Sequence, residues 1–98
     1  MRVDILYVPQ CPNLSATRSR VHQALDQRGI NALVEEVEVA THEDAQRLGM
    51  HGSPTILVNG SDPFPSEDDP SVACRLYRTA DGVEGAPSVA ELVEVLSR

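Results

Sequence analysis

Strand-like and helix-like patterns alternate along this chain, and the alternation restricts its fold more than any other feature. Residues 3–8 form a nearly continuous apolar run, as expected of a strand buried on both faces in the middle of a sheet. Apolar residues then recur at helical spacing over 12–28, and Gly29 supplies a C-terminal stop. The segment 32–39 is rich in β-formers but interrupted by two glutamates, which indicates a strand nearer the sheet edge.

The second half of the chain adds two strands and two helices. Thr41 with an acid three positions later indicates an N-cap that opens a short helix, which ends at the next glycine. Residues 54–58 predict a third strand and residues 74–78 a fourth. Ser88 and Glu91 form a capping box before the last helix. The resulting order, β-α-β-α-β-β-α, predicts a three-layer α/β sandwich.

Size and charge restrict the function classes. The 98 residues, 41% of them hydrophobic, suit a single domain over 1–98. Residues 60–72 are acidic and proline-rich, so we expect a loop there. The first apolar run is far too short for a membrane span, and we expect a cytoplasmic protein. The formal net charge of −7 argues against a nucleic acid or an anionic membrane as partner, since both attract basic surfaces.

Cys11 lies where the first strand gives way to a helix that begins with Pro12. A thiol in the first turn of a helix faces unpaired backbone N–H groups and the positive end of the helix dipole, a setting that lowers the pKa of cysteines. We therefore expect a reactive thiolate at Cys11. The alternative is a small, buried and inert residue, as free cysteines often are.

A second motif, Gly52-Ser53-Pro54-Thr55, opens the third predicted strand. A proline at the first residue of a strand cannot donate to the ladder, and in the cis form it makes a tight corner. The two motifs together indicate a thiol site on an α/β scaffold.

The element order, the Cys11-Pro12 junction and the pattern Gly-x-x-Gly-x-Pro-Thr over 49–55 together resemble the thioredoxin-like superfamily. Residues 84–92 also resemble the junction between a glycine and the last helix in that family, so the similarity extends over nearly the whole chain. The resemblance implies a thioredoxin-like sandwich with a four-stranded mixed sheet.

The same resemblance implies the layout of the site. Pro54 is expected to be cis and to lie beside Cys11, with Gly85 near the same groove. The backbone of Ser53 is expected to pair with an extended peptide or with glutathione. The implied partner is a low-molecular-weight thiol or a protein disulfide, and we expect no cofactor.

The chain departs from the family at one position that matters for the chemistry. Thioredoxins have a second cysteine three positions after the first, whereas this chain has Leu14 there. Cys11 is therefore able to form a mixed disulfide but has no neighbour to resolve it, which predicts a monothiol reaction. Several motifs, among them Cys-Pro-Asn and Ala-Cys-Arg-Leu-Tyr-Arg, are also similar to a group of small thioredoxin-like proteins, some of which carry an alkylmercury-lyase label.

Cys74 alternates with Leu76 along the fourth predicted strand, which favours a core position. In the thioredoxin arrangement that strand starts at the end of the sheet away from the site, about 10 Å or more from Cys11 at ~3.3 Å per residue. A disulfide needs α-carbons within roughly 7 Å. If the acidic loop shifts this strand, Cys74 becomes a resolving thiol or a second ligand for a soft metal.

Two further side chains are candidates for the substrate site. His51 precedes Pro54 by three positions, where it can stabilise a thiolate or carry its proton; a solvated loop histidine is the simpler interpretation. Arg78 ends the fourth strand on the side expected for Cys11, and it either binds a substrate carboxylate or pairs with the acidic loop. The acidic run 67–69 lacks the glycine and the terminal glutamate of a calcium loop and indicates a solvated loop.

Three hypotheses follow for the function. The first is monothiol disulfide exchange through Cys11. The second is binding of, or lyase-like chemistry on, a soft metal or an organomercurial by Cys11 and Cys74, because thiolates are soft ligands. The third is a peptide-binding module without enzymatic activity, in which the groove around Ser53 and Pro54 pairs with a partner's strand.

Overall fold

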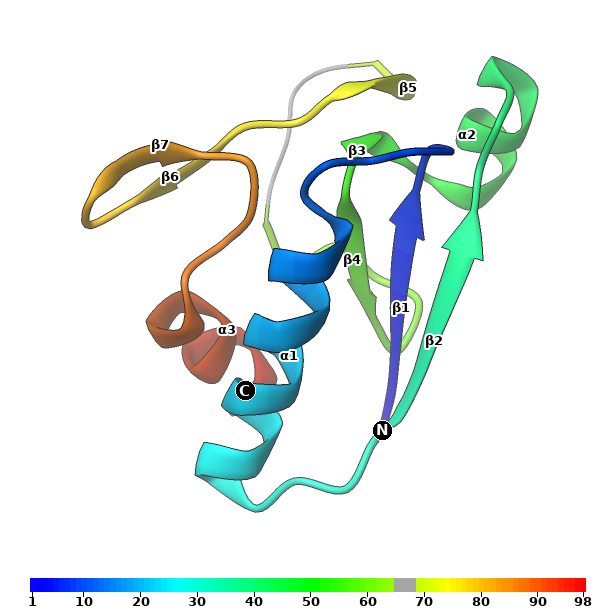
Figure 1. Ribbon diagram of the computed structural model, residues 1–98. Coiled ribbons are helices and arrows are strands. Elements are labelled where there is room, and N and C mark those ends of the chain that lie inside the picture. Colours follow the sequence, from blue (N-terminus) through cyan, green and yellow to red (C-terminus); the bar gives the residue numbers. More distant parts are fainter. Residues whose placement is uncertain (65–68) are drawn as a thin grey trace.

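The computed structural model describes residues 1–64 and 69–98, and strands and helices alternate along its first half (Figure 1). In chain order the elements are β1 Arg2–Tyr7, α1 Leu14–Arg28, β2 Leu33–Glu38, α2 His42–Leu48, β3 His51–Ser53, β4 Thr55–Val58, β5 Ser71–Cys74, β6 Tyr77–Thr79, β7 Gly82–Glu84 and α3 Val89–Leu96. The chain is thus a mixed α/β protein. No helix within the described residues is both long enough and apolar enough to cross a membrane.

The main sheet has three strands in the order β2-β1-β4, with β1 parallel to β2 and antiparallel to β4. In this register Ile5 lies between Glu36 of β2 and Ile56 of β4. The central position of β1 is confirmed, since its middle residues are buried on both faces. The edge position of β2 is confirmed as well, because Glu35 and Glu36 are exposed there.

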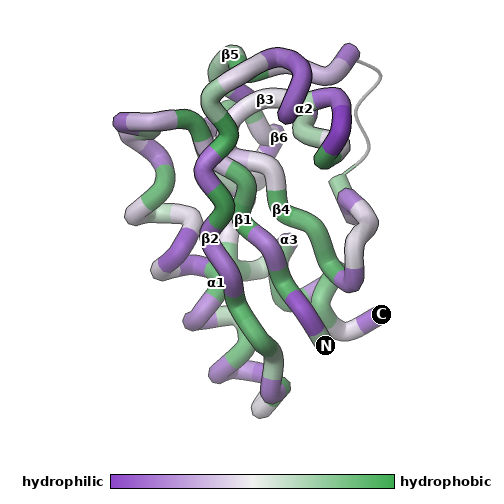
Figure 2. The backbone as a smooth tube through the Cα atoms, turned by 90° about the vertical axis from the view of Figure 1, so that its right-hand side faces the viewer, coloured by the Kyte–Doolittle hydropathy of each residue, from purple (hydrophilic) through white to green (hydrophobic). Residues whose placement is uncertain are grey.

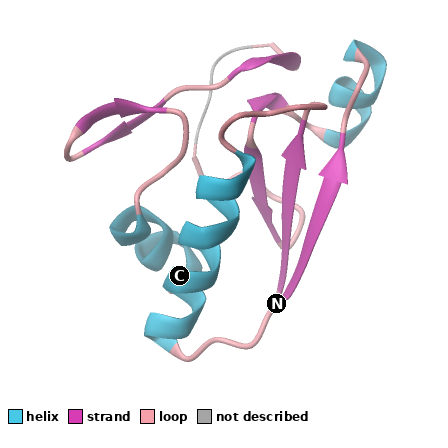
Figure 3. Ribbon diagram, in the orientation of Figure 1, coloured by secondary structure: helices cyan, strands magenta, loops and turns pink. Residues whose placement is uncertain are grey.

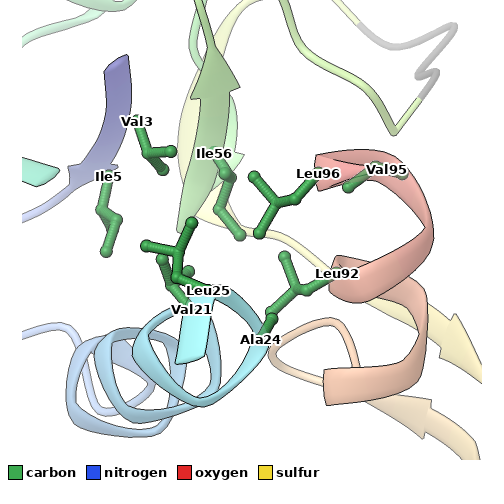
Figure 4. Close-up of a cluster of buried hydrophobic side chains, with 9 residues drawn as sticks. All are labelled: Val3, Ile5, Val21, Ala24, Leu25, Ile56, Leu92, Val95 and Leu96. Carbon is green, nitrogen blue, oxygen red and sulfur yellow. The ribbon is translucent and has the colours of Figure 1, made fainter. Parts of the chain in front are cut away.

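One face of this sheet is covered by α1 and α3, which also pack on each other. Figure 4 shows Val3, Ile5 and Ile56 of the sheet pointing toward the apolar side chains of both helices. Fully burying one such side chain stabilises a fold by about 1.5–3 kcal/mol. In Figure 2 the tube of β4 is green along most of its length, whereas α1 alternates purple and green, as expected of a helix with one covered face.

The other face is covered near one end of the sheet. Leu6, which points away from the first cluster because side chains alternate along a strand, packs with Val39, Ala45 and Met50. Ala45 belongs to α2. The helices therefore lie on both sides of the sheet, which agrees with the predicted three layers.

The ends of the helices follow the capping signals in the sequence. The Thr41 side chain accepts a hydrogen bond from the backbone N–H of Asp44, and Ser88 forms the predicted capping box with Glu91. Gly29 ends α1 in the left-handed conformation that glycine adopts most readily.

Two predictions about the strands are wrong. The main sheet has three strands rather than four, and the segment predicted as one strand at 74–78 is divided between β5 and the β6–β7 hairpin. Figure 3 shows this hairpin standing apart from the main sheet. β5 ends before Arg75, whose side chain is buried and forms an ion pair with Asp62, with 2.7 Å between Nη1 and Oδ2.

A short strand that the sequence did not reveal, β3, precedes Pro54 and pairs in parallel with β5. The two strands come close at Gly52, which has φ +101°, and a Cβ there would lie 2.8 Å from the Cβ of Arg75. The loop predicted at 60–72 is shorter than expected, because residues 71–72 belong to β5. Of the acidic run at 67–69, residues 67 and 68 lie outside the described residues.

Candidate functional site

Cys11 lies in a tight turn between β1 and α1 and is half-buried. Its backbone N–H donates to the carbonyl of Val8 (3.1 Å), and its own carbonyl accepts from the N–H of Leu14 (3.4 Å). Pro12 occupies the second position of the turn that Cys11 and Leu14 close, which suits the fixed φ of proline.

The predicted start of α1 at residue 12 is wrong, because the helix begins at Leu14 with Asn13 as its N-cap. Cys11 therefore precedes the first turn instead of lying in it. The sequence did not distinguish the two positions, since proline has nearly the same φ at the first helical position as in a turn. A functional thiol at this place needs a source of stabilisation other than the helix terminus.

Ser53 supplies a polar contact to the sulfur. Its hydroxyl donates to the Sγ of Cys11 (3.1 Å) and accepts from the backbone N–H of Val8 (3.0 Å). A hydroxyl has one hydrogen, and the N–H of Val8 occupies a lone pair, so that hydrogen is directed at the sulfur. Ser53 is only 1% exposed, and a hydrogen bond to a charged acceptor is stronger than one to a neutral acceptor. The sulfur of Cys11 thus has a buried hydroxyl as its hydrogen-bond donor.

The corner that follows Ser53 is held from several sides. The Ser53-Pro54 peptide bond is cis, the configuration that the resemblance implies, and Pro54 is fully buried. The hydroxyl of Tyr77 donates to the carbonyl of Pro54, and the hydroxyl of Thr55 donates to that of Gly52 (2.6 Å). Burial raises the pKa of Tyr77 well above its usual range, so its phenol stays protonated as a donor.

Gly85 lies against the turn that carries Cys11, since a Cβ there would come within 2.3 Å of the Asn13 side chain. Arg20 of α1 donates hydrogen bonds to the backbone carbonyls of residues 86 and 87. It also forms an ion pair with Glu84, with 3.1 Å between the Nη2 of Arg20 and the Oε1 of Glu84. The hydroxyl of Thr79, together with Arg20, holds the pKa of the Glu84 carboxyl below its usual range. The last segment before α3 is thus tied to the start of α1.

Cys74 lies beside Ser53, and the prediction that it belongs to the core is wrong. It is exposed rather than in the core, and it is the register partner of Ser53 in the ladder between β3 and β5. The carbonyl of Ser53 accepts from the backbone N–H of Arg75 (3.0 Å). The edge that the resemblance assigns to an extended peptide is therefore occupied by a strand of the same chain.

The alternation in this segment is inverted relative to the prediction. Leu76, like Cys74, is exposed, with 70% of its surface accessible. Arg75 and Tyr77 are buried. The guanidinium of Arg75 bonds to Asp62 (2.7 Å) and to the carbonyl of Phe64 (2.6 Å), and it lies 4.7 Å from the ring centre of Tyr77. Sequence reasoning missed these residues because a period of two fits either face of a short strand, and arginine is rarely buried without a partner.

The other predicted residues have looser connections to the site. His51 begins β3, and its backbone N–H donates to the hydroxyl of Thr55 (3.2 Å). Arg78 is exposed on β6 opposite Val83, and it has no ion pair with any residue in 1–64 or 69–98. The described residues contain no group of three or more potential metal ligands.

Comparison with protein-family models, with curated proteins and with solved structures gives no match to this chain.

Proposed function

We propose that this protein is a thioredoxin-like thiol protein in which Cys11 exchanges with a low-molecular-weight or protein disulfide in the cytoplasm. The observation that carries the proposal is the hydroxyl of Ser53, which is 3.1 Å from the Sγ of Cys11 and directed at it by the N–H of Val8. The partial exposure of Cys11 supports access by a disulfide.

The reaction follows from the chemistry of the thiolate. Cys11 attacks one sulfur of the disulfide, a mixed disulfide forms, and the second half of the substrate leaves as a thiolate. The hydroxyl of Ser53 stabilises the negative charge on Cys11 before the attack and again when Cys11 is the leaving group. The residue three positions later is Leu14, so a thiol from elsewhere must resolve the mixed disulfide.

Several features of the fold support the thioredoxin-like assignment. The sheet has the order β2-β1-β4 with one parallel and one antiparallel pair. A cis Pro54 follows the serine that touches Cys11, and Gly85 lies against the same turn. The third hypothesis, a peptide-binding module, has less support because β5 already occupies the edge of Ser53.

Binding of a soft metal is a second candidate function, and the pairing of Cys74 with Ser53 favours it. Two thiolates suit soft ions such as copper(I) or mercury. Titration of the protein with mercuric ion tests this idea. We expect the Cys74→Ser variant to lose affinity, and unchanged affinity and stoichiometry would exclude a two-thiol metal site.

The thiol proposal is tested by comparing the two cysteines in single-cysteine variants. Cys74→Ser retains Cys11, and Cys11→Ser retains Cys74, an exposed thiol with no hydrogen bond to any described residue. Each variant is mixed with glutathione disulfide at neutral pH, and adduct formation is followed by intact mass. We expect Cys11 to react at least several times faster than Cys74. Equal rates would show that Cys11 is an ordinary surface thiol, and the proposal would then be wrong.

A further inference from the structure

We infer that Cys74 is the thiol that resolves the mixed disulfide on Cys11, so that the working cycle passes through a Cys11–Cys74 disulfide. This inference rests on the proposed function, since it requires that a mixed disulfide forms on Cys11. It assigns a role to a cysteine that comes from a different segment of the chain, 63 residues later.

The first observation is the position of Ser53 between the two cysteines. Its hydroxyl contacts the Sγ of Cys11, and its backbone pairs with Cys74 in a parallel ladder. Paired residues in neighbouring strands are ~4.8 Å apart and project their side chains to the same face. Cys74 is therefore about one strand spacing from the residue that touches Cys11, at a point where the ladder has an irregular register. A disulfide requires α-carbons within roughly 7 Å, and the shared contact with Ser53 makes the two cysteine segments neighbours.

The second observation is the way the chain holds Cys74 in place. Arg75 follows it directly, donates its backbone N–H to the carbonyl of Ser53, and anchors its buried guanidinium on Asp62. Gly52 allows β3 and β5 to approach closely, because a Cβ at this position would overlap the Cβ of Arg75. The register that sets Cys74 opposite Ser53 is thus fixed by a buried ion pair and by close backbone packing.

The third observation is accessibility. Cys74 is the last residue of β5 and is exposed, and Cys11 lies in a turn and is half-buried. Neither sulfur is enclosed in the core, so both are accessible to a disulfide from solvent. Each thiol also lies next to the end of a regular element, where the backbone can adjust to bring two sulfurs to bonding distance.

The resolving step balances as an ordinary thiol–disulfide exchange. The thiolate of Cys74 attacks the Sγ of Cys11 in the mixed disulfide, the bond between Cys11 and the substrate sulfur breaks, and the substrate half leaves as a thiolate. Over both steps one substrate disulfide is reduced to two thiols and the protein dithiol is oxidised to one disulfide. An external thiol then reduces the Cys11–Cys74 bond.

The experiment treats the wild type and the Cys74→Ser variant with glutathione disulfide, quenches with an alkylating agent, and measures intact mass and released glutathione. In the wild type we expect two glutathione molecules released for each protein, no lasting adduct, and a peptide map that links Cys11 to Cys74 within a monomer. In Cys74→Ser we expect one glutathione released and one retained on Cys11.

A matched control moves the thiol by one residue. The double variant Cys74→Ser/Ala73→Cys keeps two cysteines, but its second thiol is one residue away from the position that pairs with Ser53. We expect it to retain the adduct on Cys11, as Cys74→Ser does. Resolution at the wild-type rate by this variant would show that the register with Ser53 is irrelevant, and the inference would be overturned.

The outcomes separate the inference from the proposed function. A wild type that retains glutathione on Cys11 while Cys74 stays free overturns the resolving role but leaves the exchange reaction intact. A disulfide that joins two copies of the chain overturns the resolving role in the same way. Failure of Cys11 to take up glutathione in both the wild type and Cys74→Ser removes the proposed function itself, and the inference with it.

Discussion

Replacing Ser53 with alanine should change the reactivity of Cys11 in opposite directions at neutral and at high pH. The substitution removes the hydroxyl that donates to the Sγ of Cys11. A hydrogen bond to a charged group contributes about 1.5–3 kcal/mol. Because Cys11 is only half-buried, we take the lower end of this range. A loss of about 1.4 kcal/mol is tenfold in an equilibrium constant, so the thiolate fraction should fall about tenfold wherever the thiol is mostly protonated.

The remaining thiolate should at the same time become a better nucleophile. A thiolate that loses stabilisation gains basicity, and nucleophilicity follows basicity with a Brønsted coefficient of about 0.4–0.5. The gain is therefore about threefold per thiolate. Wherever the thiol is mostly protonated in both proteins, the two effects combine to make Ser53→Ala about threefold slower than its parent. At a pH high enough to ionise the thiol completely in both proteins, the variant should be about threefold faster.

The assay uses an aromatic disulfide that releases a coloured thiolate, with all proteins in the Cys74→Ser background so that only Cys11 reacts. Ser71→Ala is the matched control, since Ser71 lies on the same pair of strands and its hydroxyl also accepts a backbone N–H, that of Ala73 (2.9 Å). Its rate should match the parent at every pH. Identical rates for folded Ser53→Ala and parent at both pH values would refute the reasoning, because the hydroxyl would then not act on the sulfur.

Three further predictions concern the frame around the site and are measured by urea unfolding. Burial raises the pKa of Tyr77, so its contribution to stability is complete below pH 10, the ordinary value of a tyrosine, and is lost as pH rises above it; Tyr77→Phe should lose about 1 kcal/mol at pH 7 and show a flatter decline above pH 10. Arg75→Met should destabilise by about 3–5 kcal/mol because it leaves the Asp62 carboxylate without its partner, and adding Asp62→Leu should recover part of that loss; no recovery would contradict the ion-pair explanation. Gly85→Ala should destabilise by about 1–3 kcal/mol through overlap with the Asn13 side chain, and Asn13→Ala should suppress the effect, whereas additive losses would show that the overlap is not the cause.

The order of strands and helices was largely predictable from the sequence because the signals for it are local. Caps such as Thr41 and the Ser88–Glu91 pair act within one helical turn, and the apolar run of β1 gives its central position directly. The start of α1 was displaced by two residues, since Pro12 suits a turn as well as a helix.

The segment around Cys74 shows where local signals are insufficient. Two alternations are equally regular in this segment, one with Cys74 and Leu76 inside and one with Arg75 and Tyr77 inside. The choice depends on Asp62, which receives the buried guanidinium, and this partner lies 13 residues away in the chain. The apolar leucine is exposed and the charged arginine is paired in the interior. A propensity scale for single residues does not describe such pairing between distant residues.

The sequence by itself determined that the chain carries a thiol at a strand–helix junction and a Ser-Pro corner at the start of a later strand, because both are properties of neighbouring residues. Only the tertiary structure decided that the serine touches the sulfur of Cys11 and that Cys74 pairs with the same serine. The physical reason is that register and contact between distant segments are set by buried partners and close backbone packing, which depend on the whole fold.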